Sequence, residues 1–252
     1  MSENENSLQL DVVPELIRDA LALFTEKLNA TLGDNLQSIT VVGSSLTQDY
    51  RPGKSDINTV LVLGKLTAGA LDSIAELAKP MSRKKISVPL LMTPTYIERS
   101  LDVFGVELLD FQLTHQTILG SDPFASLRPV KKDVRLQCER ELKAMLIRLR
   151  QGYIAAAANR KLVRDILIST IKGLASLLRA MLWLKDIDRP AETEPTFKKA
   201  GAEFSIGIEP LITVAKWQYE RSKPDAVQVR SVFESVYSIV DKLAVIVDEL
   251  EV

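Results

Sequence analysis

Hydrophobic and polar positions follow two different patterns along this chain of 252 residues, and the change comes near residue 130. Before it, stretches with helical periodicity alternate with short apolar runs of the kind found in buried strands. After it, apolar residues recur at every third or fourth position, which indicates a bundle of helices. The pattern predicts an α+β protein. We expect an α/β domain with a small mixed sheet over residues 1–130 and an all-α helical bundle over residues 131–252.

The first half of the chain predicts alternating helices and strands. Gly33 is expected to end the first helix and Pro80 the second, while Pro89 makes the third strand a candidate for a sheet edge. The second strand is almost entirely apolar, so we expect both of its faces to be covered. The predicted elements are helices over 14–32, 66–79 and 96–101, and strands over 36–42, 57–63, 86–92 and 106–113.

The second half predicts a central helix over 162–184 that is long and apolar enough to suggest a membrane span. Asp165, Lys172 and Arg179 argue against this, because a charge at the bilayer centre costs about 2.5–3.5 kcal/mol. They also lie on one narrow polar stripe, which is typical of the central helix of a bundle. We therefore expect no membrane partner. The other predicted helices cover 133–153, 197–204, 209–220 and 226–249.

Composition narrows the possible function classes. The formal net charge is −1, from 32 basic and 33 acidic side chains, so nothing attracts nucleic acid to the chain as a whole. Cys138 is the one cysteine, which excludes a disulfide framework and a cysteine zinc cluster. His115 is the one histidine, and we expect structural roles for both. The first residues are polar and acidic, unlike a signal peptide, so the cytoplasm is the expected location.

Candidate chemistry gathers between the first two predicted strands. Gly43-Ser44 follows the first strand, and such a turn lets a phosphate approach backbone N–H groups while the serine hydroxyl donates to it. Asp56 and Asn58 are two residues apart at the start of the second strand, so both side chains point the same way. The plainer alternatives are an ordinary capped turn at Gly43-Ser44 and a turn-stabilising acid at Asp56.

This stretch resembles the nucleotidyltransferase superfamily, whose signature is Gly-Ser, a loop of about a dozen residues, and Asp-apolar-acid on the next strand. Polymerase beta, the aminoglycoside and lincosamide adenylyltransferases and the minimal nucleotidyltransferases are members. Here the pattern is Gly43-Ser44, the segment from Ser45 to Ser55, and Asp56-Ile57-Asn58. The helical half is similar to the substrate-binding domain of such enzymes. The resemblance implies a nucleoside triphosphate and Mg²⁺. The implied nucleotide-binding residues are Gly43, Ser44, Ser45 and Lys54; Asp56 is catalytic and holds the metal with Asn58.

The sequence departs from the family pattern at two of three acidic positions. Asn58 occupies the second one, and the third falls in the segment 86–92, which contains no acid. An amide offers Mg²⁺ one neutral oxygen and cannot bridge two ions well. Glu107 and Asp110 are possible substitutes, but at three residues apart on a strand they would face opposite ways. The expected metal site is therefore short of negative charge, and any Mg²⁺ binding should be weak.

Basic residues cluster around the junction of the first two helices of the bundle. Arg148, Arg160 and Arg164 are candidates for a groove that binds a nucleotide or an acidic acceptor. The plainer alternative is a solvated helix face.

These observations leave three functions open. The first is transfer of a nucleoside monophosphate to an acceptor, a small molecule or a protein, held between the two domains. The second is a catalytically degenerate module that binds a nucleotide or another ligand for regulation. The third is a helical interaction scaffold. The base preference, the acceptor and the oligomeric state cannot be read from the sequence.

Overall fold

The computed structural model describes residues 8–220 and 223–252. The start of the chain, residues 1–7, on which the expectation of no signal peptide rests, lies outside the described residues. The chain divides into two compact units, each with its own hydrophobic core. The first, called the α/β unit, comprises Met1–Leu101 and Asp110–Arg128. The second, called the helical unit, comprises Asp102–Leu109 and Pro129–Val252.

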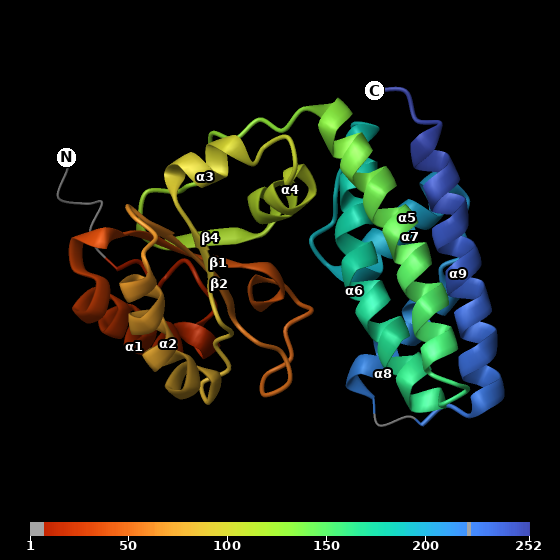
Figure 1. Ribbon diagram of the computed structural model, residues 1–252, viewed down its shortest axis with the longest axis horizontal. Coiled ribbons are helices and arrows are strands. Elements are labelled where there is room, and N and C mark those ends of the chain that lie inside the picture. Colours follow the sequence, from red (N-terminus) through yellow and green to blue (C-terminus); the bar gives the residue numbers. More distant parts are fainter. Residues whose placement is uncertain (1–7, 221–222) are drawn as a thin grey trace. The chain divides into compact units, whose positions relative to one another are not determined.

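A four-stranded mixed sheet forms the centre of the α/β unit (Figure 1). Its order is β3-β2-β1-β4, in which β1 runs antiparallel to β2 and β4, and β3 runs parallel to β2. The apolar runs of β1 and β2 fill the middle positions, and the short β3 lies at an edge. The strands are β1 (Leu36–Val42), β2 (Asn58–Leu63), β3 (Leu90–Met92) and β4 (His115–Gly120). The predicted α+β class with a small mixed sheet is confirmed.

Two helices cover one face of this sheet. Helices α1 (Glu15–Leu32) and α2 (Ala68–Ser82) contribute to the same hydrophobic core as β1 and β2, and Figure 1 shows them together below the sheet. The short α3 (Pro94–Arg99) lies on the other side. Gly33 ends α1, as predicted, with a φ of 50°. The prediction that Pro80 stops α2 is wrong. Pro80 sits in the last turn, where the helix continues for only two more residues after losing one N–H donor.

The predicted strand over 106–113 is also wrong, because this segment is the helix α4 (Gly105–Leu113). Its polar residues alternate with apolar ones, which suggested a strand. The first turn of α4 contacts α5 (Lys131–Ala155). There, Gln137 Oε1 accepts a hydrogen bond from the Val106 N–H at 2.9 Å. A side chain at Gly105 would come within 2.7 Å of Val134 Cγ2, so glycine permits this close approach. The fourth strand is instead β4, directly after α4.

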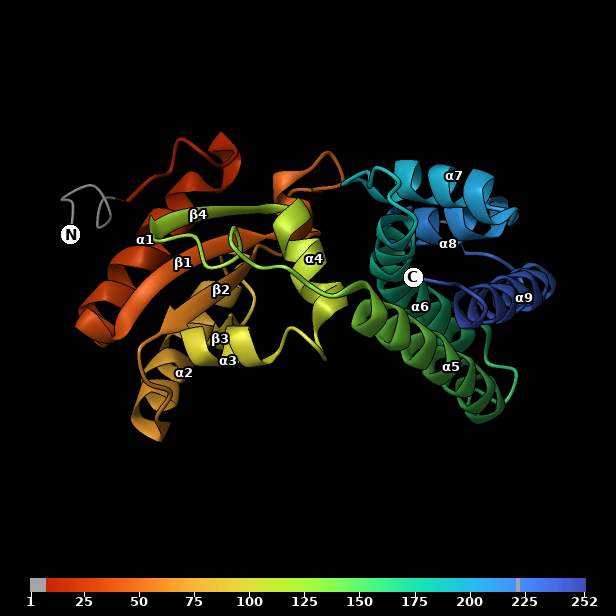
Figure 2. The same cartoon turned by 90° about the horizontal axis from the view of Figure 1, so that it is seen from above.

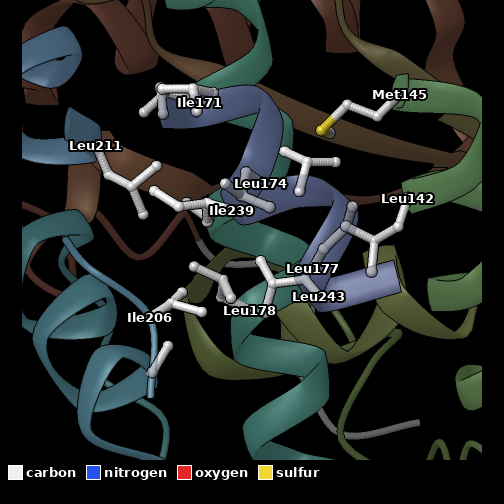
Figure 3. Packing of buried hydrophobic residues seen from close by; sticks show 14 of the residues in the cluster. Leu142, Met145, Ile171, Leu174, Leu177, Leu178, Ile206, Leu211, Ile239 and Leu243 are labelled. Atoms are coloured by element: carbon white, nitrogen blue, oxygen red, sulfur yellow. The ribbon is translucent and has the colours of Figure 1, made fainter. Parts of the chain in front are cut away.

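The helical unit surrounds the apolar helix α6 (Arg160–Leu184). Leucines of α6 interlock with side chains from the helices around it, as Figure 3 shows for Leu174, Leu177 and Leu178. Among the described helices, α6 alone is long and apolar enough to cross a membrane, but 56% of its most apolar window is buried, as in a core helix. The remaining helices are α7 (Thr193–Phe204), α8 (Glu209–Tyr219) and α9 (Ala226–Asp248), which Figure 2 shows from above.

Candidate functional site

The turn after β1 is a short 3₁₀ helix, Gly43–Leu46, whose geometry is fixed by its neighbours. Gly43 has a φ of +78°, which glycine adopts at little cost, and its N–H donates to Thr114 O at 3.0 Å. The N–H and the hydroxyl of Thr47 both donate to Ser44 O. The Gly43 N–H is therefore already used, and Ser44, whose hydroxyl can donate, is half-exposed. Ser45 is buried, so its side chain faces the interior.

The start of β2 lies beside this turn. Asn58 is the register partner of Val42, and a Cβ added to Gly43 would lie 3.9 Å from Asn58 Nδ2. Asp56 and Asn58 are exposed, whereas Ile57 is buried between them, so the two polar side chains share the open face. The structure thus brings Gly43 and Asn58 into contact range and extends the same polar edge to Asp56.

Asp56 has a basic neighbour that the sequence analysis did not identify. Lys85 Nζ lies 4.0 Å from Asp56 Oδ1, in an ion pair between partly exposed side chains. Tyr50 lies close by, and burial together with the negative charge of Asp56 raises the pKa of its phenol. An ammonium group thus lies within ion-pairing distance of the carboxylate at this edge.

Asn58 also has a partner from the same segment. Ser87 Oγ donates to Asn58 Oδ1 at 2.7 Å and lies 3.2 Å from Ile57 O. A parallel bridge between Ile57 and Ile86 sets this alignment. The segment in which the third acid was expected thus brings a hydroxyl to Asn58. Sequence reasoning missed Lys85 and Ser87 because it searched this segment for acids.

The comparisons with known proteins concern the fold. The sequence matches no protein-family model and no curated protein. The structure is similar to the crystal structure of the spectinomycin adenyltransferase AAD(9) from Enterococcus faecialis with ATP and spectinomycin, with a TM-score of 0.59. The similarity covers 89% of this chain and 98% of that one, at 13% sequence identity. The chain has a nucleotidyltransferase fold. At this identity the similarity establishes the fold and leaves the chemistry to the residues of this chain.

The residues present do not fit the two-metal site that a nucleotidyltransferase fold implies. Two ions held about 3.5–4 Å apart need several carboxylates around them. Here Asp56 is paired with Lys85, and the Asn58 oxygen already accepts from Ser87. Among the residues that the structure describes, no group of three His, Cys, Asp or Glu side chains could hold a metal ion.

Glu107 and Asp110 are the possible substitutes for the two acids that the predicted metal site lacks. The expectation that they face opposite sides of a strand is wrong, since both lie on α4. Glu107 belongs to the helical unit, where its carboxylate accepts a hydrogen bond from Gln137 Nε2 at 2.6 Å. Asp110 belongs to the α/β unit.

Lys54 lies in an exposed turn of the loop before β2. Its N–H and that of Ser55 both donate to Arg51 O, at 3.0 and 2.8 Å, and the Arg51 N–H donates to Ser55 Oγ. These bonds give the loop a defined shape. A role for Lys54 in nucleotide binding stays a prediction.

The three candidate arginines belong to the helical unit and contact groups of that unit. Arg148 lies 3.7 Å from a carboxylate oxygen of Glu141 and is largely exposed. Arg160 donates to Pro224 O at 3.2 Å, and Arg164 donates to Trp217 O. The contacts of Arg160 and Arg164 join α6 to the segment before α9 and to α8, respectively, whereas that of Arg148 is a surface ion pair. That they also border the nucleotide site stays a prediction.

The surroundings of the one histidine and the one cysteine indicate structural roles for both. His115 Nε2 lies 2.9 Å from Asp122 Oδ2, and the Phe124 N–H donates to the other carboxylate oxygen at 2.8 Å. Partial burial opposes ionisation of Asp122, but its bonds with His115 and Phe124 prevail and lower its pKa. Cys138 is buried in the bundle core, and burial raises the pKa of its thiol to about 12. Such a thiol is inert near neutral pH.

Proposed function

We propose that this protein binds a nucleoside triphosphate along the polar edge formed by Ser44, Asp56 and Asn58, and that it transfers nucleotides very slowly or not at all. The observation that carries the proposal is the contact between the glycine turn after β1 and Asn58 at the start of β2. A turn of this kind allows a phosphate to approach the backbone, and the half-exposed Ser44 hydroxyl can donate to it. The similar adenyltransferase structure contains ATP, which supports a nucleotide as the ligand.

Slow transfer follows from the charges at this edge. Attack of an acceptor hydroxyl on a phosphorus atom needs positive charge to stabilise the developing negative charge, and two-metal enzymes supply it with divalent ions. Two such ions about 4 Å apart repel by roughly 16 kcal/mol at an effective dielectric constant of 20, before ligands offset it. Asp56 alone cannot provide that offset. The shortage of negative charge favours the catalytically degenerate binding module over the active transferase. Nucleotide binding also gives the α/β unit a function, which the helical-scaffold alternative does not.

Titration calorimetry with ATP and GTP tests the proposal. We expect saturable binding to the unmodified protein and at least about tenfold weaker binding to Ser44→Ala, which is the effect of losing one hydrogen bond to a charged oxygen. Ser126→Ala is the matched control, because Ser126 is an exposed serine of the same unit outside this edge. The absence of binding by either nucleotide to the unmodified protein would refute the proposal.

A further inference from the structure

Asn58 presents a hydrogen-bond donor to the glycine turn. The Asn58 oxygen accepts from Ser87 Oγ, and its amide nitrogen is the atom nearest to Gly43, 3.9 Å from the position of an added Cβ. An amide NH₂ group donates and cannot coordinate a cation. Asn58 is therefore oriented for an anion at the position where the family pattern places a metal-binding carboxylate.

Lys85 adds a positive charge to the same edge, and its backbone is held in an unusual conformation. Its φ is +63°, which is uncommon for any residue other than glycine. The Lys85 N–H donates to Ser82 O at 3.0 Å, and its carbonyl accepts from the Ile57 N–H at 2.7 Å. Such conformations persist where the surroundings fix them, and they cluster at functional sites. Here the bond to Ile57 fixes the Lys85 backbone beside Asp56, two residues before β2 begins.

We propose that Lys85 takes the place of the divalent metal ion, so that this edge binds a nucleoside triphosphate directly, without Mg²⁺. The inference rests on the nucleotide binding proposed above. The Lys85 ammonium and the Asn58 amide donate to phosphate oxygens, together with the Ser44 hydroxyl. All three hydrogen bonds are charge-assisted because the phosphate is ionised. Of the three donors, Lys85 alone also carries a positive charge, so its Coulomb attraction for the triphosphate makes its contribution the largest.

Asp56 has a different role in such a site from its role in a metal site. Its ion pair with Lys85, at 4.0 Å between partly exposed groups, constrains the lysine little, whereas its own negative charge repels the phosphates. In a metal site the same carboxylate would be required for binding. The two possibilities therefore predict effects of opposite sign for the replacement of Asp56 by asparagine.

The first experiment is a calorimetric titration of ATP into the unmodified protein, once with EDTA and once with excess Mg²⁺. We expect ATP to bind in EDTA at least as tightly as in excess Mg²⁺, because a bound Mg²⁺ ion occupies phosphate oxygens that the site would contact directly. In EDTA, Lys85→Met should weaken binding by about tenfold or more, since one charge-assisted hydrogen bond is lost. Lys84→Met is the matched control, because it removes the same charge from the adjacent exposed residue, and it should change the affinity by less than about threefold.

The second experiment uses Asp56→Asn under both conditions. We expect ATP to bind this variant in EDTA at least as tightly as it binds the unmodified protein, and loss of binding there would overturn the inference. ATP binding that requires Mg²⁺ in the unmodified protein would also overturn it, while leaving nucleotide binding itself supported. No binding under either condition would instead refute the proposed function. Thermal melting of each variant distinguishes these results from unfolding.

Discussion

Replacement of Asn58 by aspartate should make nucleotide binding depend on Mg²⁺. The variant places a second carboxylate on the same face of the chain as Asp56, beside the glycine turn. A unit charge about 4 Å from another interacts with it by about 4 kcal/mol at an effective dielectric constant of 20, so a free triphosphate should be strongly repelled. We expect ATP affinity in EDTA to fall by at least about tenfold, and Mg²⁺ to restore it by supplying a cation that both carboxylates can bind.

Calorimetry with EDTA and with Mg²⁺ measures this change, and pyrophosphate release measured in parallel should stay low because the third acidic position still lacks an acid. Asn159→Asp is a suitable control. It adds the same charge at the start of α6, where Asn159 accepts from the N–H groups of Lys161 and Leu162 and aspartate caps equally well. An Asn58→Asp variant that binds ATP in EDTA as tightly as the unmodified protein would contradict the account.

Replacement of Gly120 by alanine should destabilise the α/β unit by about 2–5 kcal/mol. Gly120 ends β4 with a φ of +75°, and a Cβ there would lie 1.9 Å from Gln37 O, a backbone atom that cannot rotate away. The left-handed conformation costs an L-residue about 1–2 kcal/mol, and overpacking typically adds about 1–3 kcal/mol. The start of β1 would have to separate from the end of β4.

Chemical denaturation followed by circular dichroism gives the free energy of unfolding for this comparison. Gly53→Ala is the matched control, since Gly53 has the same φ of +75° and nothing lies within 4 Å of its added Cβ. It should lose only the conformational part, about 1–2 kcal/mol. Equal losses in the two variants would show that the predicted clash at Gly120 is relieved without cost.

The sequence correctly predicted elements whose limits are set by residues close together in the chain, such as β1 and the end of α1. The β-branched and apolar run of β1, bounded by turn residues, has the predicted limits Leu36–Val42. Glycine after an apolar periodic stretch ended α1 as expected. The two wrong predictions, the helix stop at Pro80 and the strand over 106–113, applied a local rule where the rest of the structure decided otherwise. The helix α2 continues for two residues past Pro80 although this residue donates no hydrogen bond, and α4 is helical where Val106 and Leu109 pack into the bundle core.

The residues of the candidate site were only partly predictable from the sequence, because some of them come from a segment that is distant in the chain. The alternation of side chains on a strand placed Asp56 and Asn58 on one face without reference to the rest of the chain. Ser87 is 29 residues from Asn58, and their hydrogen bond depends on the parallel bridge at Ile57. Pairing of distant segments leaves no periodic signal in the sequence. The positive φ of Lys85 leaves none either.

The most direct test of the central claim is a titration of the isotope-labelled protein with ATP in EDTA, followed by the chemical shifts of its backbone amides. We expect saturable shifts at Ser44, Asn58 and Lys85 without any metal, and no comparable shift at Ser126, an exposed residue of the same unit outside this edge. No shifts, or shifts at this edge that occur only after Mg²⁺ is added, would contradict it.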